Sequence, residues 1–135
     1  MPVTYTIDRK EKVIRTQCVG MVTFPEVADH FQQLERDPDC AERLAVLLDL
    51  SEVRSTPDTG QIRAVSYELR KIQGKVRFDV CAVVASRDVL FGMLRVFEVM
   101  AEPYFRSICV FRGIAEAEAW LVSQRQQSAK DAPIP

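Results

Sequence analysis

The chain has 135 residues, of which 47% are apolar and 27% charged, a length and composition that fit one domain with a substantial core. Its 18 basic and 19 acidic side chains leave a net charge of −1, which excludes a protein drawn to nucleic acid by its overall field. No apolar run approaches the ~20 residues of a membrane-spanning helix, and ordinary glycine and proline contents exclude collagen-like or disordered chains.

The N-terminus and the cysteines indicate a reducing compartment. No basic segment followed by an apolar stretch opens the chain, so we expect no secretory signal and a cytoplasmic location. The four cysteines form no CxxC pair and no Cys/His metal spacing. Cys18, Cys81 and Cys109 lie in apolar runs and are predicted to be buried thiols. Cys40 lies in the polar segment Asp37–Glu42 and is the one cysteine predicted to be exposed.

The chain begins with a predicted β-hairpin made of two short alternating runs, Val3–Asp8 and Lys12–Val19. In the second run, Ile14, Thr16 and Cys18 should share one face of the strand, since side chains alternate with a period of two. The hairpin therefore supplies the first two strands.

A helix is predicted next, because Thr23-Phe24-Pro25-Glu26 combines a capping box with proline in the first turn. This helix should end before Asp37-Pro38, since the residue before a proline disfavours helical geometry. The following run, Leu44–Leu50, is almost entirely apolar and predicts a strand covered on both faces.

The second half of the chain repeats the alternation of helix and strand. A second helix is predicted from near Pro57 to Gly74, and Val76–Ala85 predicts a strand. A third helix is predicted from Ser86 to Pro103. A last strand, Ser107–Phe111, and a helix with inward-facing apolar residues complete the series; those residues are Ile114, Ala117, Trp120 and Leu121.

The predicted order is β-β-α-β-α-β-α-β-α, which indicates an α/β fold. Strands that alternate with helices favour parallel neighbours joined by right-handed crossovers, and the hairpin adds one antiparallel edge strand to a mostly parallel five-stranded sheet. One domain over residues 1–122 is expected. Residues 123–135 are polar in composition and are predicted to form a frayed tail.

The sequence contains few residues in catalytic patterns. The single histidine, His30, excludes a His-rich metal site and is predicted to occupy a surface or half-buried position on the first helix. Asp49 lies near the end of an apolar strand, where it either hydrogen-bonds the next loop or serves acid–base chemistry. No glycine-rich phosphate loop or Gly-x-Ser-x-Gly elbow is present, so we predict no enzyme and no cofactor.

The segment from Asp49 through Ser51 to Gly60 places hydroxyl groups before and at the start of the second helix. One interpretation is structural: Thr56 or Asp58 caps the helix. The other is functional: a hydroxyl there receives a phosphate, because the helix N-terminus favours negative charge. The sequence leaves both interpretations open.

The helix over residues 89–100 has a wider apolar surface than one packed stripe requires. A glycine inside a helix costs up to ~1 kcal/mol against alanine, so a close approach of another group can justify it. Ordinary core, a dimer contact and the wall of a lipophilic pocket are the three interpretations. The residues concerned are Phe91, Gly92, Met93, Val96, Phe97 and Met100.

Two stretches resemble a known family. Leu47-Leu48-Asp49-Leu50-Ser51-x-Val53 before Asp58-Thr59-Gly60, together with the element order, resembles the STAS domain of bacterial anti-sigma-factor antagonists. Phe91-Gly92-Met93, with Arg95 and Phe97 after it, is similar to the corresponding helix of small bacterial SpoIIAA-like proteins. The resemblance spans about residues 3–122.

The resemblance implies a superhelix of strand–helix turns, shared with CRAL-TRIO lipid-transfer domains, and a non-enzymatic binding or regulatory module. In antagonists the phosphorylated serine precedes the glycine of Asp-Ser-Ser-Gly, which corresponds here to Thr59. Pro57 and Asp58 replace the first two residues of that motif. The similarity to SpoIIAA-like proteins implies instead a lipophilic ligand or peripheral contact with a membrane.

Two functional hypotheses follow from these observations. In the first, the helix over residues 89–100 helps form an apolar ligand groove or a homodimer face. In the second, the chain is a phosphoswitch that binds a protein partner of the anti-sigma type, with Thr59 as acceptor.

Overall fold

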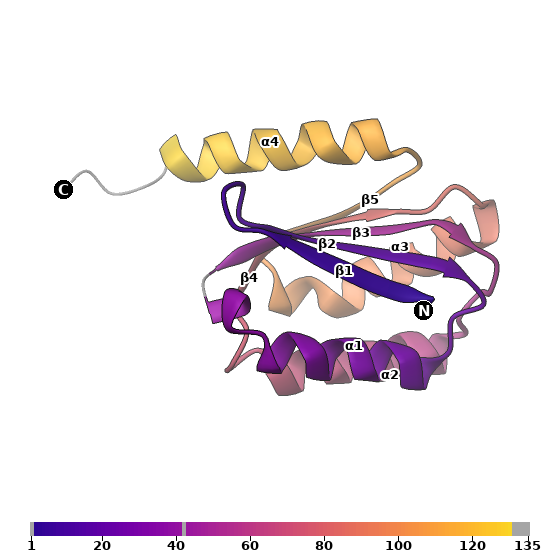
Figure 1. The fold of residues 1–135 in the computed structure, drawn as a ribbon. Coiled ribbons are helices and arrows are strands. Elements are labelled where there is room, and N and C mark those ends of the chain that lie inside the picture. The colour runs from indigo at the N-terminus through magenta and orange to yellow at the C-terminus, as the bar shows by residue number, and fades with distance from the viewer. Residues whose placement is uncertain (1, 42, 131–135) are drawn as a thin grey trace.

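The hairpin predicted at the start of the chain is present: β1 (Val3–Asp8) pairs antiparallel with β2 (Val13–Gly20). This computed structural model describes residues 2–41 and 43–130 (Figure 1). The remaining strands are β3 (Leu44–Val53), β4 (Phe78–Val84) and β5 (Ser107–Phe111). The helices are α1 (Phe24–Arg36), α2 (Thr59–Ile72), α3 (Asp88–Ala101) and α4 (Ile114–Lys130), with short 3-10 turns at Pro38–Ala41 and Glu102–Tyr104.

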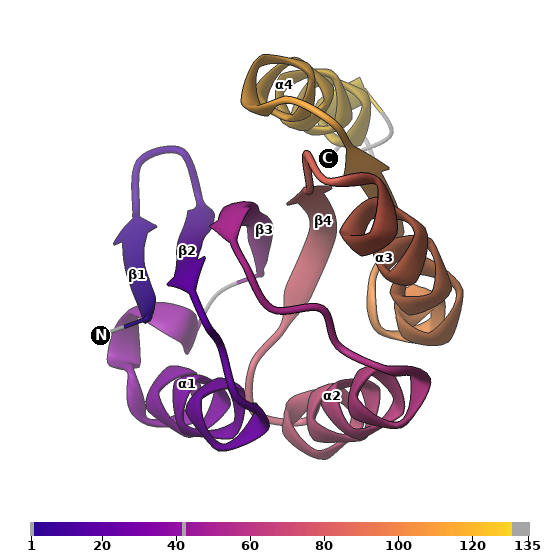
Figure 2. The ribbon, with the colours of Figure 1, turned by 90° about the vertical axis from the view of Figure 1, so that its right-hand side faces the viewer.

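The five strands lie in the sheet in the same order as in the chain, β1-β2-β3-β4-β5. The pairs β2–β3, β3–β4 and β4–β5 are parallel, and β1 is the antiparallel edge strand. Because every crossover steps in the same direction, α1, α2 and α3 lie on one face of the sheet, whereas α4 covers the other face (Figure 2). The predicted α/β fold is confirmed.

The central strand β3 is covered on both faces, as its apolar run predicted. Val46 and Leu48 pack into the cluster on the side of α1, α2 and α3. Ala45 and Leu47 belong to the smaller cluster beneath α4, since neighbouring side chains point to opposite faces. The sheet therefore separates two apolar layers of different size.

The apolar cluster beneath α4 is the smaller of the two. Ala117 and Leu121 are buried against the sheet, and the ring centroid of Trp120 lies 5.6 Å from that of Phe111. An ion pair between Arg15 of β2 and Glu118 ties the helix to the sheet. Apolar packing and an ion pair therefore both hold α4 on the sheet.

Local signals set the starts of α1 and α2. Thr23 stands at the N-cap of α1, where the Glu26 carboxylate accepts hydrogen bonds from the backbone N–H and the hydroxyl of Thr23. Asp58 caps α2: its carboxylate accepts a hydrogen bond from the Gln61 N–H at 2.8 Å, and the Gln61 side chain accepts from the Asp58 N–H. Of the two predicted caps of α2, Asp58 fills the role.

Two predictions at the residue level were wrong. Cys40 is 2% exposed, because the 3-10 turn Pro38–Ala41 folds its side chain into the core despite the polar residues beside it. The segment 123–130 is not a frayed tail but continues α4 as far as Lys130, while residues 131–135 lie outside the described part. Strand β3 also runs past Leu50 to Val53, so Asp49 lies within the strand.

In the part of the chain that the structure describes, none of the helices has the length and apolar character needed to cross a membrane.

Candidate functional site

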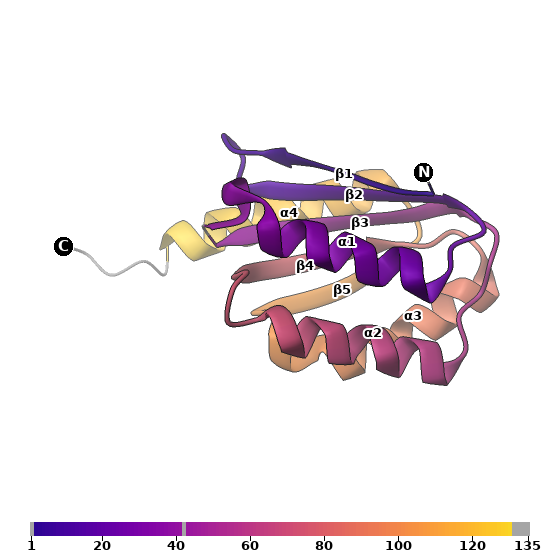
Figure 3. The same ribbon diagram turned by 60° about the horizontal axis from the view of Figure 1, so that its bottom comes forward.

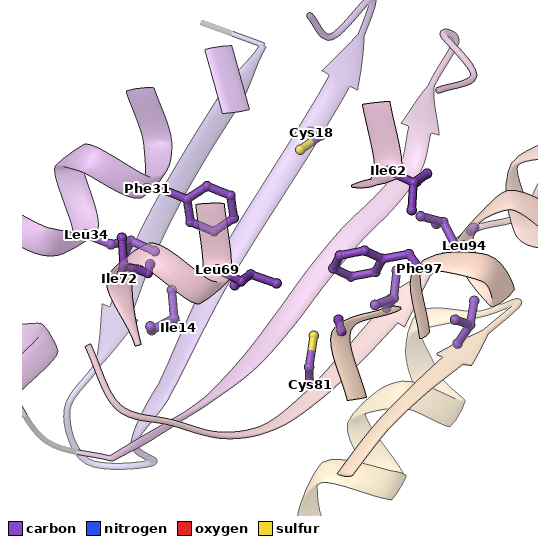
Figure 4. Packing of buried hydrophobic residues seen from close by; sticks show 14 of the residues in the cluster. Ile14, Cys18, Phe31, Leu34, Ile62, Leu69, Ile72, Cys81, Leu94 and Phe97 are labelled. Atoms are coloured by element: carbon purple, nitrogen blue, oxygen red, sulfur yellow. The ribbon is translucent and has the colours of Figure 1, made fainter. Parts of the chain in front are cut away.

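An apolar cavity of about 510 Å³ lies between the sheet and the three helices on its larger face. Its lining comes from β2, β3 and β4 on one side and from α1, α2 and α3 on the other. All the labelled side chains in Figure 4 except Ile72 belong to this lining. Cavities of roughly 300–1,000 Å³ are the size in which proteins bind small molecules.

Helices and strands both contribute walls to the cavity. α1 contacts α2 and β1, and α2 contacts both α1 and α3, so the three helices support one another along this face of the sheet (Figure 3). Phe31 of α1 and Leu69 of α2 line the space from the helix side, and Ile14 of β2 lines it from the sheet side. The space is therefore bounded by side chains of both layers.

The walls carry almost no polarity and no formal charge. Among the described residues, those that line the cavity include no aspartate, glutamate, lysine or arginine. Polar groups are few and lie mostly at one end, where Thr23, Ser55, Thr56 and Gln61 are found. An occupant of the interior must therefore be largely apolar and uncharged over most of its surface.

The mouth lies at the carboxyl ends of β2 and β3, next to the first turns of α1 and α2; Figure 2 views the molecule from this end. Met21 lines the cavity yet is 68% exposed, and Pro25, Thr56 and Gln61 on the same rim are also exposed. In parallel α/β sheets, ligand sites gather at this edge of the sheet.

Hydrogen bonds tie together the two segments that form the rim. The Ser55 hydroxyl accepts from the Val22 N–H at 3.0 Å, and the Arg54 N–H donates to the Gly20 carbonyl at 2.8 Å. The Arg87 guanidinium donates to the Val53 carbonyl at 3.1 Å and to the Ser55 carbonyl at 2.6 Å. The rim is thus a defined structure that joins β2, β3 and the start of α3.

One polar pair lies deep in the lining. The Nε2 atom of His30, on α1, lies 3.2 Å from the hydroxyl oxygen of Thr16, which is 2% exposed on β2. Within the described residues, the buried Nδ1 atom of His30 has no hydrogen-bond partner. Burial lowers the pKa of His30 from 6.5 to about 4, so the imidazole is neutral near pH 7.

The two cysteines of the lining are poor nucleophiles. Burial is the main cause that raises the pKa of Cys18 to about 12, and burial also raises that of Cys81. A thiol that stays protonated does not attack or bind a metal readily, so these side chains act as small apolar groups. Cys109, on β5, is half-buried, and its pKa is also raised mainly by burial.

Most of the residues predicted from the third helix pack into the core. Phe97 is buried and lines the cavity, whereas Phe91, Met93, Val96 and Met100 are partly buried against the core. The helix also supplies Leu90 and Leu94 to the lining, and neither was among the predicted site residues. At Gly92 an added Cβ would meet no atom of this chain within 4 Å.

The loop residues predicted as a switch do not form one cluster. Asp49 Oδ1 accepts hydrogen bonds from the Ser51 N–H at 3.0 Å and from its hydroxyl at 2.7 Å. Asp58, Thr59 and Gly60 are exposed at the first turn of α2, beside the rim of the cavity. The predicted phosphoacceptor role of Thr59 stays a prediction.

The structure does not bring Asp49 and His30 together. His30 lines the cavity, whereas Asp49 lies between Leu48 and Leu50, the lining residues of β3, and so takes the alternate position on the strand. Across residues 2–41 and 43–130, no group of three or more histidine, cysteine or acidic residues could hold a metal ion.

Much of the lining was outside the predicted site, although two signals for it were present in the sequence. The alternation of β2 had already placed Ile14, Thr16 and Cys18 on one face, and all three line the cavity. A threonine on that inward face and a histidine beside Phe31 on the first helix are polar residues on apolar faces. Such residues mark a polar contact inside an apolar layer.

Comparisons with known proteins support the fold. Comparison with models of known protein families gives no match, and no curated protein matches the sequence. Among solved structures, one from Shewanella loihica PV-4 is similar, described as an uncharacterized protein of the DUF3478 family with a SpoIIAA-like fold. The TM-score is 0.60 at 16% sequence identity, covering 88% of this chain and 91% of that one. The chain thus has a SpoIIAA-like α/β fold.

Proposed function

We propose that this protein is a non-enzymatic binding module that holds a lipophilic ligand in the cavity between the sheet and α1, α2 and α3. The observation that carries the proposal is the cavity itself: about 510 Å³, apolar walls, no charged lining residue among those described, and a mouth at the strand ends. Ligand pockets with these properties bury most of a small apolar molecule.

The apolar walls of the cavity give a physical reason for an occupant. Water is a poor filler there, because a buried water molecule needs two to four polar partners and the lining offers few. A largely apolar ligand would remove the apolar wall from contact with water, which is favourable in proportion to the area covered.

Adjacent leucines of β3 provide a matched test of this proposal. Leu48 lines the cavity, whereas Leu47 is 3% exposed in the cluster beneath α4. In Leu48→Phe the larger side chain takes up cavity volume, so we expect at least tenfold weaker binding of phenylnaphthylamine, a neutral fluorescent probe, with no loss of stability. In Leu47→Phe overpacking should cost about 1–3 kcal/mol of stability and leave probe binding unchanged.

Fluorescence titration and thermal unfolding of the two variants give both readouts. Probe binding that is absent from the wild type, or equally strong in Leu48→Phe, would contradict a ligand site in this cavity. The Leu47→Phe control separates an effect on the cavity from a general effect of enlarging β3.

We propose an anti-sigma-type phosphoswitch as the second candidate function, and the position of Thr59 favours it. Thr59 is exposed in the first turn of α2, next to the cap residue Asp58. A phosphate at this position would lie where the helix dipole stabilises negative charge, and it would change the surface beside the mouth of the cavity. Partner binding would then depend on the state of one hydroxyl.

Mass spectrometry of Thr59-containing peptides, from protein purified out of its own cells, tests this candidate. The phosphoswitch predicts a phosphorylated fraction, and it predicts that Thr59→Glu and Thr59→Ala differ in the protein partner they retain. Unmodified Thr59 under all growth conditions, or equal partner binding by the two variants, would remove it.

A further inference from the structure

The lining of the cavity runs along the length of the layer between the strands and the helices. On β3 it extends from Val46, near the first residue of the strand, to Val53 at the last, a span of about 23 Å at the rise of an extended strand. On α1 it extends from Phe24 to Leu34, a span of about 15 Å at the rise of an α-helix. A volume of about 510 Å³ spread over this length makes a space that is longer than it is wide.

The two ends of this space differ in polarity. At the mouth, the lining includes side chains with hydroxyl or amide groups, namely Thr23, Ser55, Thr56 and Gln61. At the opposite end, the strand register places Ile14, Val46 and Cys81 side by side on β2, β3 and β4 (Ile14 and Cys81 are labelled in Figure 4). The rings of Phe78 and Phe105, 5.4 Å apart between centroids, also line this end. We call these five residues the inner end, and it is apolar.

The polar groups at the mouth can still bind a ligand. The side-chain oxygen of Gln61 accepts from the Asp58 N–H at 2.9 Å, and its NH2 group remains a donor. Thr56 is exposed, and its hydroxyl can both donate and accept. Between the two ends, Thr16 and His30 lie 3.2 Å apart and bind each other. A polar group on a ligand is therefore best accommodated at the mouth, where water is also within reach.

We propose that the ligand is a single-chain amphiphile that lies lengthwise in the cavity, with its aliphatic tail at the inner end and its polar head group at the mouth. This inference rests on the proposed ligand-binding function and names the class of the ligand and its orientation. An extended chain covers the apolar walls along their length, which is favourable in proportion to the area covered. The reverse orientation would bury the head group at the inner end without hydrogen-bond partners, which is costly.

Two straight-chain alcohols, octanol and dodecanol, measure how the affinity depends on chain length. Each buried methylene should raise the affinity about fourfold, so we expect dodecanol to bind at least tenfold more tightly than octanol. Displacement of phenylnaphthylamine, calibrated separately on each protein variant, gives the affinities.

Matched enlargements at two positions of β3 locate the tail. Val46 belongs to the inner end, whereas Leu50 lines the cavity nearer the mouth. In Val46→Phe the inner end is partly filled, so we expect dodecanol to lose at least fivefold in affinity while octanol changes less than twofold. In Leu50→Phe both alcohols should weaken by similar factors, because both chains pass this position. Thermal unfolding shows whether each variant is folded.

Nuclear Overhauser effects between ¹³C-labelled wild-type protein and unlabelled dodecanol test the orientation without any substitution. We expect the terminal methyl group to contact the rings of Phe78 or Phe105, and the methylene that carries the hydroxyl to contact Thr56 or Gln61. Contacts of the terminal methyl group with the mouth residues would overturn the proposed orientation.

The outcomes separate this inference from the proposed function. If phenylnaphthylamine binds but dodecanol binds no more tightly than octanol, the cavity remains a ligand site and the single-chain ligand is wrong. The same conclusion follows if Val46→Phe weakens both alcohols by equal factors. If neither phenylnaphthylamine nor either alcohol binds the wild type, the proposed function itself fails.

Discussion

At the scale of single residues, His30 couples the cavity to pH. Its pKa is lowered from 6.5 to about 4 by burial alone, because the protonated imidazole loses hydration in the apolar layer. In the unfolded chain the ring takes up a proton as pH falls through 6.5, whereas the folded ring does so only near pH 4. The unfolded state therefore binds more protons between these values, and stability falls as pH falls across this window.

The expected loss between pH 6.5 and 4 is on the order of 3 kcal/mol in the free energy of unfolding, which corresponds to the 2.5-unit difference between the two pKa values. Denaturant unfolding of wild type and His30→Phe across this range measures it. The variant lacks the titrating group, so its stability should decrease less steeply. Parallel curves for the two proteins would contradict a buried neutral imidazole.

The burial of Cys40 could not be predicted from its neighbours in the sequence. Its neighbours Asp37 to Asp39 are polar, and the sequence pattern therefore indicated an exposed thiol. A single 3-10 turn reverses the direction of its side chain and buries it with Leu34 and Leu44. Burial is the main cause that raises its pKa to about 11, so this thiol is also unreactive. Such a short turn has no strong sequence signal.

At the scale of the elements, α3 carries a glycine that the monomer does not need. Gly92 is exposed and helical, and an added Cβ would meet nothing within 4 Å. Gly92→Ala should therefore stabilise the protein by about 0.5–1 kcal/mol, because alanine restricts the unfolded chain and favours helix. Thermal and denaturant unfolding of the purified variant measure this change.

The same substitution tests the predicted homodimer face on this helix. Val89 and Val99 are 67% and 70% exposed, so an apolar strip remains on the outer side of α3. If a second copy packs closely against Gly92, the alanine side chain should weaken association in sedimentation measurements and cancel the gain in stability. An unchanged sedimentation profile together with higher stability would remove Gly92 from any such contact.

The elements themselves were predicted well because their signals are local. The capping box of Thr23 with Pro25 and the apolar run of β3 specify a helix start and a buried strand within a few residues. The start of the second helix was predicted near Pro57, and α2 begins at Thr59 with Asp58 as its cap. The extension of α4 to Lys130 was missed for a physical reason. Its last turns are polar all round and depend on helix propensity and on ion pairs such as Arg125 with Glu11, not on an apolar stripe.

In the whole molecule, a single sheet separates a small apolar layer beneath α4 from a larger layer that contains the cavity. Alternation in the sequence predicted that Ile14, Thr16 and Cys18 share one face of their strand, and all three line the cavity. It could not predict that a cavity remains between the strands and the helices on that face. Helix-to-sheet spacing depends on packing between helices, which no local pattern specifies. The cavity therefore emerged only from the structure.

This arrangement suits a binding module. The sheet and α4 provide a stable base, whereas the ligand occupies volume that the protein's own side chains leave unfilled. Ligand binding should consequently raise the stability of the native state, since only the folded chain contains the site. The rim hydrogen bonds of Ser55 and Arg87 hold the mouth in place around it.

Native mass spectrometry of gently purified wild type and Leu48→Phe shows whether the cavity holds a ligand. We expect a small-molecule adduct on the wild type that organic solvent removes, and little or no adduct on Leu48→Phe, in which the cavity is partly filled. A bare wild-type protein that also takes up no uncharged aliphatic compound on incubation, or an adduct retained equally by the variant, would contradict it.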